Sequence, residues 1–152
     1  MGSLRLSRRP GRDKRGLNDA PVRGLVVDDM IHLDTNFLIG ALVAGSLEDK
    51  RLRGWLRSNQ TVRISSIVWG EFLCGPISNT IAEQTAELFG EPVRFDGIDA
   101  TLAAQLFNTG GRRRGSMIDC MIAATAMREN AMLATSNTAN FQRFATVGLS
   151  LA

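Results

Sequence analysis

The sequence predicts an α/β fold built on a small parallel sheet. From residue 30 onward, short apolar runs alternate with segments of helical periodicity. This alternation is typical of parallel sheets, because two parallel strands are usually joined by a helix. With 152 residues and 44% hydrophobic content, the chain is long enough to bury one core, so one folded domain is expected.

The expected elements follow one another along the chain. Strands are expected at residues 30–33, 62–65 and 132–135, with a short strand or turn at 93–95 and a candidate edge strand at 147–151. Helices are expected at residues 37–43, 47–58, 66–74, 79–89, 100–107 and 116–130, with a short helical turn at 141–144. Gly75-Pro76 ends one helix, and Gly110-Gly111 opens a loop.

Residues 1–29 differ in composition from the rest. They are rich in Arg, Gly and Asp and lack apolar periodicity, which predicts a disordered basic tail or an upstream extension, with the domain at 30–152. Met30 is an alternative true start, because a strand begins there at once. The segment holds seven basic and four acidic residues, which accounts for the whole net charge of +3. Global charge is therefore weak evidence for nucleic-acid binding.

Membrane insertion and disulfide chemistry are not expected. No apolar run approaches the roughly 18 residues of a membrane span, and the basic start lacks the apolar stretch of a signal peptide, so the protein is expected to be cytoplasmic. Cys74 and Cys120 match no zinc-binding spacing, and both are expected to be reduced and buried.

Three acidic residues occupy positions that suggest chemistry. Asp34 follows the first strand, and ligands of open parallel sheets bind at the carboxyl ends of strands. Glu71 lies on a helix among apolar neighbours, and Asp119 lies in a helix that is apolar all round. A strand end and two helices can bring hard oxygen ligands to one cation. The set therefore predicts a metal site.

Each acid also has a structural interpretation. Asp34 can cap the following helix. Glu71 can sit at the rim of the core, and Asp119 can form a capping box with Ser116. The only histidine, His32, lies within the first strand and is expected to pack in the core rather than act as a base.

Four motifs occur in an order and spacing that resemble a PIN domain. They are Leu33-Asp34-Thr35-Asn36, then residues 65–72, 118–126 and 133–137. The resemblance extends over residues 30–152 and is nearest to the VapC-type toxins of bacterial toxin–antitoxin pairs. It implies a three-layer α/β sandwich in which a central parallel sheet is flanked by helices.

The resemblance also implies a function and its residues. It makes Asp34, Glu71 and Asp119 the catalytic ligands of Mg²⁺ or Mn²⁺, with Thr135 and Asn36 in support. It implies endoribonuclease activity on RNA, a cognate antitoxin and a homodimer. Asn137 departs from the pattern, because many relatives carry a fourth acid there. Its carbonyl oxygen can bind metal weakly but brings no charge, which leaves one or two ions open.

One local basic cluster precedes the helix of Asp119. Arg112, Arg113 and Arg114 lie just before the N-terminus of that helix, and both features attract phosphate. Arg112 is the first candidate for contact with the RNA backbone. A solvated charged loop, or one Arg paired with a site carboxylate, is the structural alternative.

Two further functions are compatible with the sequence. A catalytically weakened PIN-like module that binds RNA or protein is motivated by Asn137. A nuclease acting on DNA is the third hypothesis, because metal-assisted phosphodiester hydrolysis does not itself distinguish the two sugars.

Overall fold

A four-stranded parallel sheet lies at the centre of the molecule. The computed structural model describes residues 29–152, so the predicted tail falls outside the described residues apart from Asp29. The strands are β1 (Ile31–Leu33), β2 (Val62–Arg63), β3 (Met132–Ala134) and β4 (Ser150–Leu151). Their order is β2-β1-β3-β4, and every neighbouring pair is parallel. The predicted α/β fold with a parallel sheet is confirmed.

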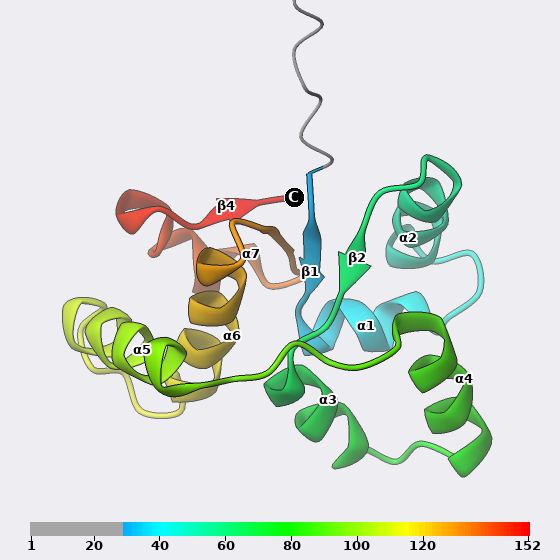
Figure 1. Cartoon of the computed structure of the whole chain (residues 1–152), viewed down its shortest axis with the longest axis horizontal. Helices are drawn as coiled ribbons and strands as arrows, with labels where there is room; N and C mark the ends of the chain where they lie inside the picture. Colours follow the sequence, from blue (N-terminus) through cyan, green and yellow to red (C-terminus); the bar gives the residue numbers. More distant parts are fainter. Residues whose placement is uncertain (1–28) are drawn as a thin grey trace, which may run out of the picture.

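Helices flank the sheet on both sides (Figure 1). They are α1 (Thr35–Ala41), α2 (Leu47–Arg57), α3 (Ser66–Leu73), α4 (Asn79–Phe89), α5 (Gly97–Thr109), α6 (Met117–Arg128) and α7 (Thr138–Gln142), with a 3-10 turn at Ala145–Val147. In Figure 1, α5 and α6 lie together at one side of the molecule, whereas α1, α2, α3 and α4 lie at the other. The result is the three-layer arrangement that the sequence implies.

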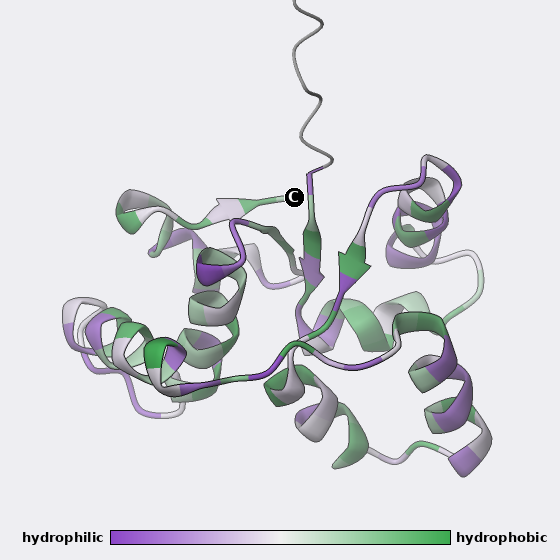
Figure 2. Ribbon diagram, viewed as in Figure 1, coloured by the Kyte–Doolittle hydropathy of each residue, from purple (hydrophilic) through white to green (hydrophobic). Residues whose placement is uncertain are grey.

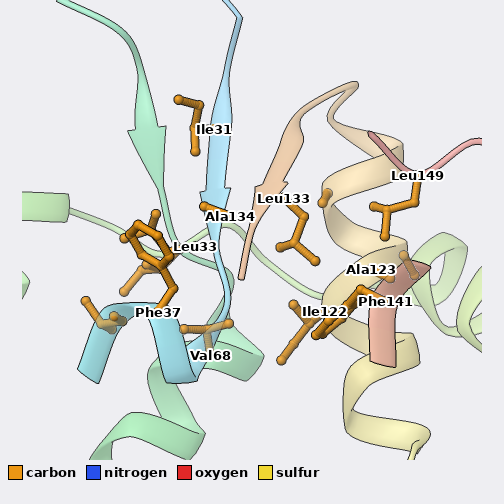
Figure 3. Close-up of a cluster of buried hydrophobic side chains, with 14 of the residues drawn as sticks. Ile31, Leu33, Phe37, Val68, Ile122, Ala123, Leu133, Ala134, Phe141 and Leu149 are labelled. Carbon is orange, nitrogen blue, oxygen red and sulfur yellow. The ribbon is translucent and has the colours of Figure 1, made fainter. Parts of the chain in front are cut away.

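The core occupies both sides of the sheet. Figure 3 shows Leu33, Phe37 and Val68 meeting beside β1, while Leu133 and Ile122 meet beside β3. All five are at most 2% exposed. Each buried side chain of this size contributes about 1.5–3 kcal/mol through the hydrophobic effect. In the hydropathy colouring of Figure 2, β1 and β2 each carry a green segment, and the outer helices alternate between green and purple.

Local capping explains where the helices differ from their predicted bounds. Helix α5 begins at Gly97, three residues earlier than predicted, because Asp96 and Asp99 form a capping box at its start. Helix α1 begins at Thr35 directly after its cap, Asp34. The predicted strand or turn at 93–95 is a single bridge between Val93 and Ser65.

The two cysteines differ in burial. Cys120 is buried in α6, as predicted, but Cys74 is exposed, so that part of the prediction is wrong. Helix α3 ends at Leu73, and Cys74 therefore lies just beyond the packed part of the helix. Between residues 29 and 152, no helix has both the length and the apolar character needed to cross a bilayer.

Candidate active site

Asp34 lies at the carboxyl edge of the sheet, between the ends of β1 and β3. The register pairs Leu33 with Ala134, and the Asp34 N–H donates to the Ala134 carbonyl at 2.9 Å. Asp34 follows β1 and Thr135 follows β3, so this register places the two residues next to each other. The Thr135 hydroxyl donates to Asp34 Oδ2 at 2.8 Å. The Thr35 N–H donates to Oδ1 at 2.8 Å. The capping and site interpretations of Asp34 are thus compatible.

The Asp34 carboxyl is buried without a cationic partner among residues 29–152. It is 3% exposed, and no Lys or Arg of this part of the chain forms an ion pair with it. Burial raises its pKa from 3.8 to about 6, the hydrogen bonds from Thr135 and Thr35 oppose that shift, and the nearby charges of Asp119 and Glu71 add to it. A bound cation would therefore stabilise the ionised form of Asp34.

Glu71 faces α1 but is more exposed than its apolar neighbours suggested. Helix α3 buries the stripe formed by Val68 and Phe72, and Glu71 lies beside that stripe on the exposed surface. The expectation of a carboxylate inside the apolar face is therefore wrong, and the rim position is correct. The Thr35 hydroxyl donates a short hydrogen bond to Glu71 Oε2. Thr35 thereby links α1 to the second acidic residue.

Asp119 sits in the first turn of α6 and is partly buried. Burial raises its pKa, and Glu71 raises it further, whereas Arg143 and the Asn140 amide lower it. The Asn140 side chain lies 3.5 Å from Asp119 Oδ2. The predicted capping box with Ser116 is wrong, because the Ser116 hydroxyl donates to the Arg113 carbonyl instead. Asp119 is therefore free of a capping role.

The donor chemistry of the three acids fits a hard divalent cation. Their charges act on one another, so Asp34, Glu71 and Asp119 share one electrostatic environment. Within residues 29–152, no group of three or more acidic, His or Cys side chains is placed so that it could hold a metal ion by itself. Mg²⁺ usually keeps several waters and takes only one or two carboxylates directly. The open arrangement suits that mode of binding.

The other predicted residues are not all at the site. The Asn137 N–H donates to Thr135 Oγ1 at 2.9 Å, so its backbone supports the residue that holds Asp34. Asn36 is exposed. Arg112 is exposed with a φ of 52°, and it does not line the pocket beside Asp119. His32 is 2% exposed, and burial lowers its pKa to about 4, in agreement with its predicted place in the core.

Three contributing residues were not predicted from the sequence. Thr35 follows Asp34 directly, and its hydroxyl could have been considered as a partner for an acid. Asn140 lies in the short helix α7 and Arg143 follows it, and no local motif marks either residue. Their positions near Asp119 depend on the packing of α7 against α6, which no spacing in the sequence reveals.

The chain matches a known family over most of its length. The family model for the PIN domain matches residues 31–147. No curated protein matches the chain significantly.

Several solved structures have a similar fold. VapBC2 from Rickettsia felis, bound to a promoter DNA fragment, is 26% identical, with 81% of this chain and 97% of that chain covered and a TM-score of 0.64. FitAcB from Neisseria gonorrhoeae is 25% identical, with 80% and 96% covered and a TM-score of 0.60. DNA-bound VapBC from Salmonella typhimurium, at 23% identity, 82% and 97% coverage and a TM-score of 0.66, shares the fold. The chain therefore belongs to the PIN-domain family.

Proposed function

We propose that this protein is a metal-dependent endoribonuclease that acts as the toxin of a toxin–antitoxin pair. The observation that carries the proposal is the buried Asp34 carboxyl. Its hydrogen-bond donors within residues 29–152 are both neutral, and the charges of Asp119 and Glu71 act on it. A buried carboxylate without a counter-charge is unfavourable unless it is protonated or binds a cation. Its position at the carboxyl edge of a parallel sheet is where ligands of such folds bind.

Asp34, Glu71 and Asp119 would hold the Mg²⁺ or Mn²⁺. The bound ion would supply an activated water and offset the charge that builds on the phosphoryl oxygens. The Thr135 hydroxyl fixes the orientation of Asp34, and the Thr35 hydroxyl fixes that of Glu71. These bonds keep the carboxylates in place before substrate arrives, which reduces the cost of ordering them.

The partners follow from the relatives. VapBC2 and FitAcB, together with a toxin–antitoxin complex from Klebsiella pneumoniae, support a cognate antitoxin for this chain, and a homodimer is the expected assembly. An apolar groove of about 400 Å³ between α1, α2 and α4 offers a place for an antitoxin segment. Leu42 and Leu88 on its walls are 44% and 53% exposed, so a partner that covers them would gain hydrophobic free energy.

Cleavage of RNA by the partner-free protein tests the proposal. Wild type, Asp119→Asn and the control Glu83→Gln are incubated with labelled total RNA in Mg²⁺, Mn²⁺ or EDTA. Glu83 is exposed on α4, away from the site. We expect discrete fragments from wild type and the control, none in EDTA, and none from Asp119→Asn.

Two other outcomes would redirect the interpretation. Folded wild type that binds RNA but never cuts it would favour the binding module, for which the uncharged Asn137 provides the motive. Equal cutting of a matched single-stranded DNA would favour a nuclease without sugar selectivity.

A further inference from the structure

A polar hollow opens beside Asp119, and Asp34 does not line it. It is a shallow pocket of about 120 Å³. The polar side chains that line it are those of Arg113, Arg114, Ser116, Asp119, Asn140 and Arg143. The pocket brings together the loop before α6, the first turn of α6, and the end of α7.

The charge of this pocket is opposite to that expected for a metal site. Three arginines and one aspartate line it, which leaves an excess of positive charge. Of the three arginines, Arg143 is the one whose charge acts on Asp119. Arg113 and Arg114 are exposed and available to a ligand. Among the described residues, none of the three arginines forms an ion pair, so no carboxylate there neutralises their charges through direct contact.

Arg143 is the arginine of the pocket that packs against an aromatic ring. Its guanidinium lies 4.5 Å from the centroid of the Phe144 ring, a contact that fixes the side chain by cation–π attraction. Its Nε is buried and has no hydrogen-bond partner within residues 29–152. An unsatisfied donor of a charged group is costly. The Arg143 side chain as a whole is only half-buried, so its charge is open to an anion in the pocket.

Arg112, the first candidate from the sequence, lacks these properties. It is exposed, it has a left-handed backbone conformation, and it lies outside the pocket lining. The three-arginine run therefore divides, because Arg113 and Arg114 line the pocket that contains Asp119 and Arg112 does not.

We propose that Arg143, together with Arg113 and Arg114, binds a backbone phosphate of the RNA next to the one that is cleaved. This inference rests on the proposed function, since it assigns a phosphate-binding subsite to the same RNA. A guanidinium suits this task because its planar donors can bind two phosphate oxygens at once. The neighbouring carboxylates would repel a bare phosphodiester, so a fixed cation beside them lets the strand approach. Arg143 is a positioning residue in this account.

The test measures RNA binding without cleavage. Fluorescence anisotropy of a labelled single-stranded RNA is followed in EDTA over a range of salt concentrations, with the full chain. The variants are Arg143→Gln, Arg143→Lys, and Arg57→Gln as a control that is exposed on α2 and outside the pocket. Arg112→Gln and a double variant of Arg113 and Arg114 separate the two parts of the loop.

The salt dependence gives a readout that a merely structural role would not change. Loss of one phosphate contact should weaken binding several-fold and lower the slope of log K against log salt by roughly 0.7. We expect this for Arg143→Gln, whereas Arg143→Lys should retain most of the slope because it retains the charge. Arg57→Gln should match wild type. A slope for Arg143→Gln equal to that of wild type, or no RNA binding by wild type, would overturn the inference.

Folding and cleavage measurements complete the design. Thermal melts identify variants that lose structure through the Phe144 contact, and Arg143→Lys then carries the comparison. In cleavage assays, Arg143→Gln should raise KM more than it lowers kcat. If wild type cuts RNA but Arg143→Gln has the same salt slope as wild type, the phosphate subsite is refuted and the proposed function is not. An Arg143-dependent slope without any cutting would refute the proposed function and leave the subsite standing.

Discussion

Two buried aspartates of the same domain have opposite surroundings. Asp99 is 0% exposed, and the Arg128 guanidinium donates to it from Nε at 2.6 Å and from Nη2 at 3.1 Å. Asp34 is 3% exposed, and its donors are one hydroxyl and one backbone N–H. Burial alone thus does not mark a functional acid. The absence of a cation within the described residues, together with two neighbouring carboxylates, distinguishes Asp34.

Asp99 has a purely structural explanation. It accepts from the Asp96 N–H at 3.0 Å in the capping box of α5, and its ion pair with Arg128 joins α5 to α6. Arg128 also donates to the Arg94 carbonyl at 2.9 Å, which links the loop before α5 to the same ion pair. Asp99 therefore has both its counter-charge and its hydrogen-bond donors inside the fold.

The largest expected effect is on RNA cleavage, and it distinguishes Asp34 from Asp99. Asp34→Asn removes a metal ligand but preserves the shape of the side chain. Its amide oxygen can still accept from one of the two donors of Asp34, whereas its NH2 group can only donate. We expect RNA cleavage to fall by more than about 100-fold, beyond the usual cost of losing a supporting group. The metal-free variant should melt at or above the wild-type temperature, because an unfavourable charge is gone. Gel-based cleavage and thermal melts check both statements. Cleavage within about 10-fold of wild type would contradict them.

Loss of the Asp99 partner should act on stability. Arg128→Met leaves a carboxylate without exposure and without a counter-charge, which costs about 3–5 kcal/mol of unfolding free energy. Urea titration measures this value. Adding Asp99→Asn to Arg128→Met should recover part of the loss, because the neutral amide no longer needs a cation. A loss under about 1 kcal/mol would show that the ion pair does not hold α5 to α6.

The metal-free protein should lose stability as pH rises through the range set by Asp34. Its pKa is raised from 3.8 to about 6, so the folded state binds more protons than the unfolded state between these values. Stability falls by about 3 kcal/mol across this window, at about 1.4 kcal/mol per pKa unit. Urea titrations in EDTA at several pH values measure the trend. Asp34→Asn should reduce the trend and leave the part due to Asp119, whose pKa is also raised. An identical trend in that variant would assign all of it to other groups.

The smallest expected effect concerns the hydroxyl that orients Asp34. Thr135→Val removes the donor to Asp34 Oδ2 and should weaken Mn²⁺ binding by about 10–100-fold. Thr135→Ser retains the hydroxyl and provides the matched control. Calorimetric titration of both variants would contradict this role if the Val and Ser proteins bound Mn²⁺ equally well.

The fold and part of the site could be predicted because they depend on local patterns. The end of an apolar run placed Asp34 and Thr135 at strand ends, and parallel pairing then brought them together. The exposure of Glu71 could not be predicted, because it depends on which stripe of α3 faces the core. The Asp99–Arg128 pair joins residues 29 positions apart and leaves no periodic signal. Arg143 was missed for the same reason, whereas the Arg run drew attention to Arg112.

Mn²⁺ binding followed by electron paramagnetic resonance tests the central claim most directly. The free ion gives a strong signal that is lost on binding, so wild type and Asp34→Asn can be titrated without any RNA. Arg128→Lys serves as the control, since it keeps a cation beside Asp99. We predict saturable binding by wild type and the control, and none by Asp34→Asn in the same range. Equal binding by all three proteins would contradict the assignment of Asp34 as a metal ligand.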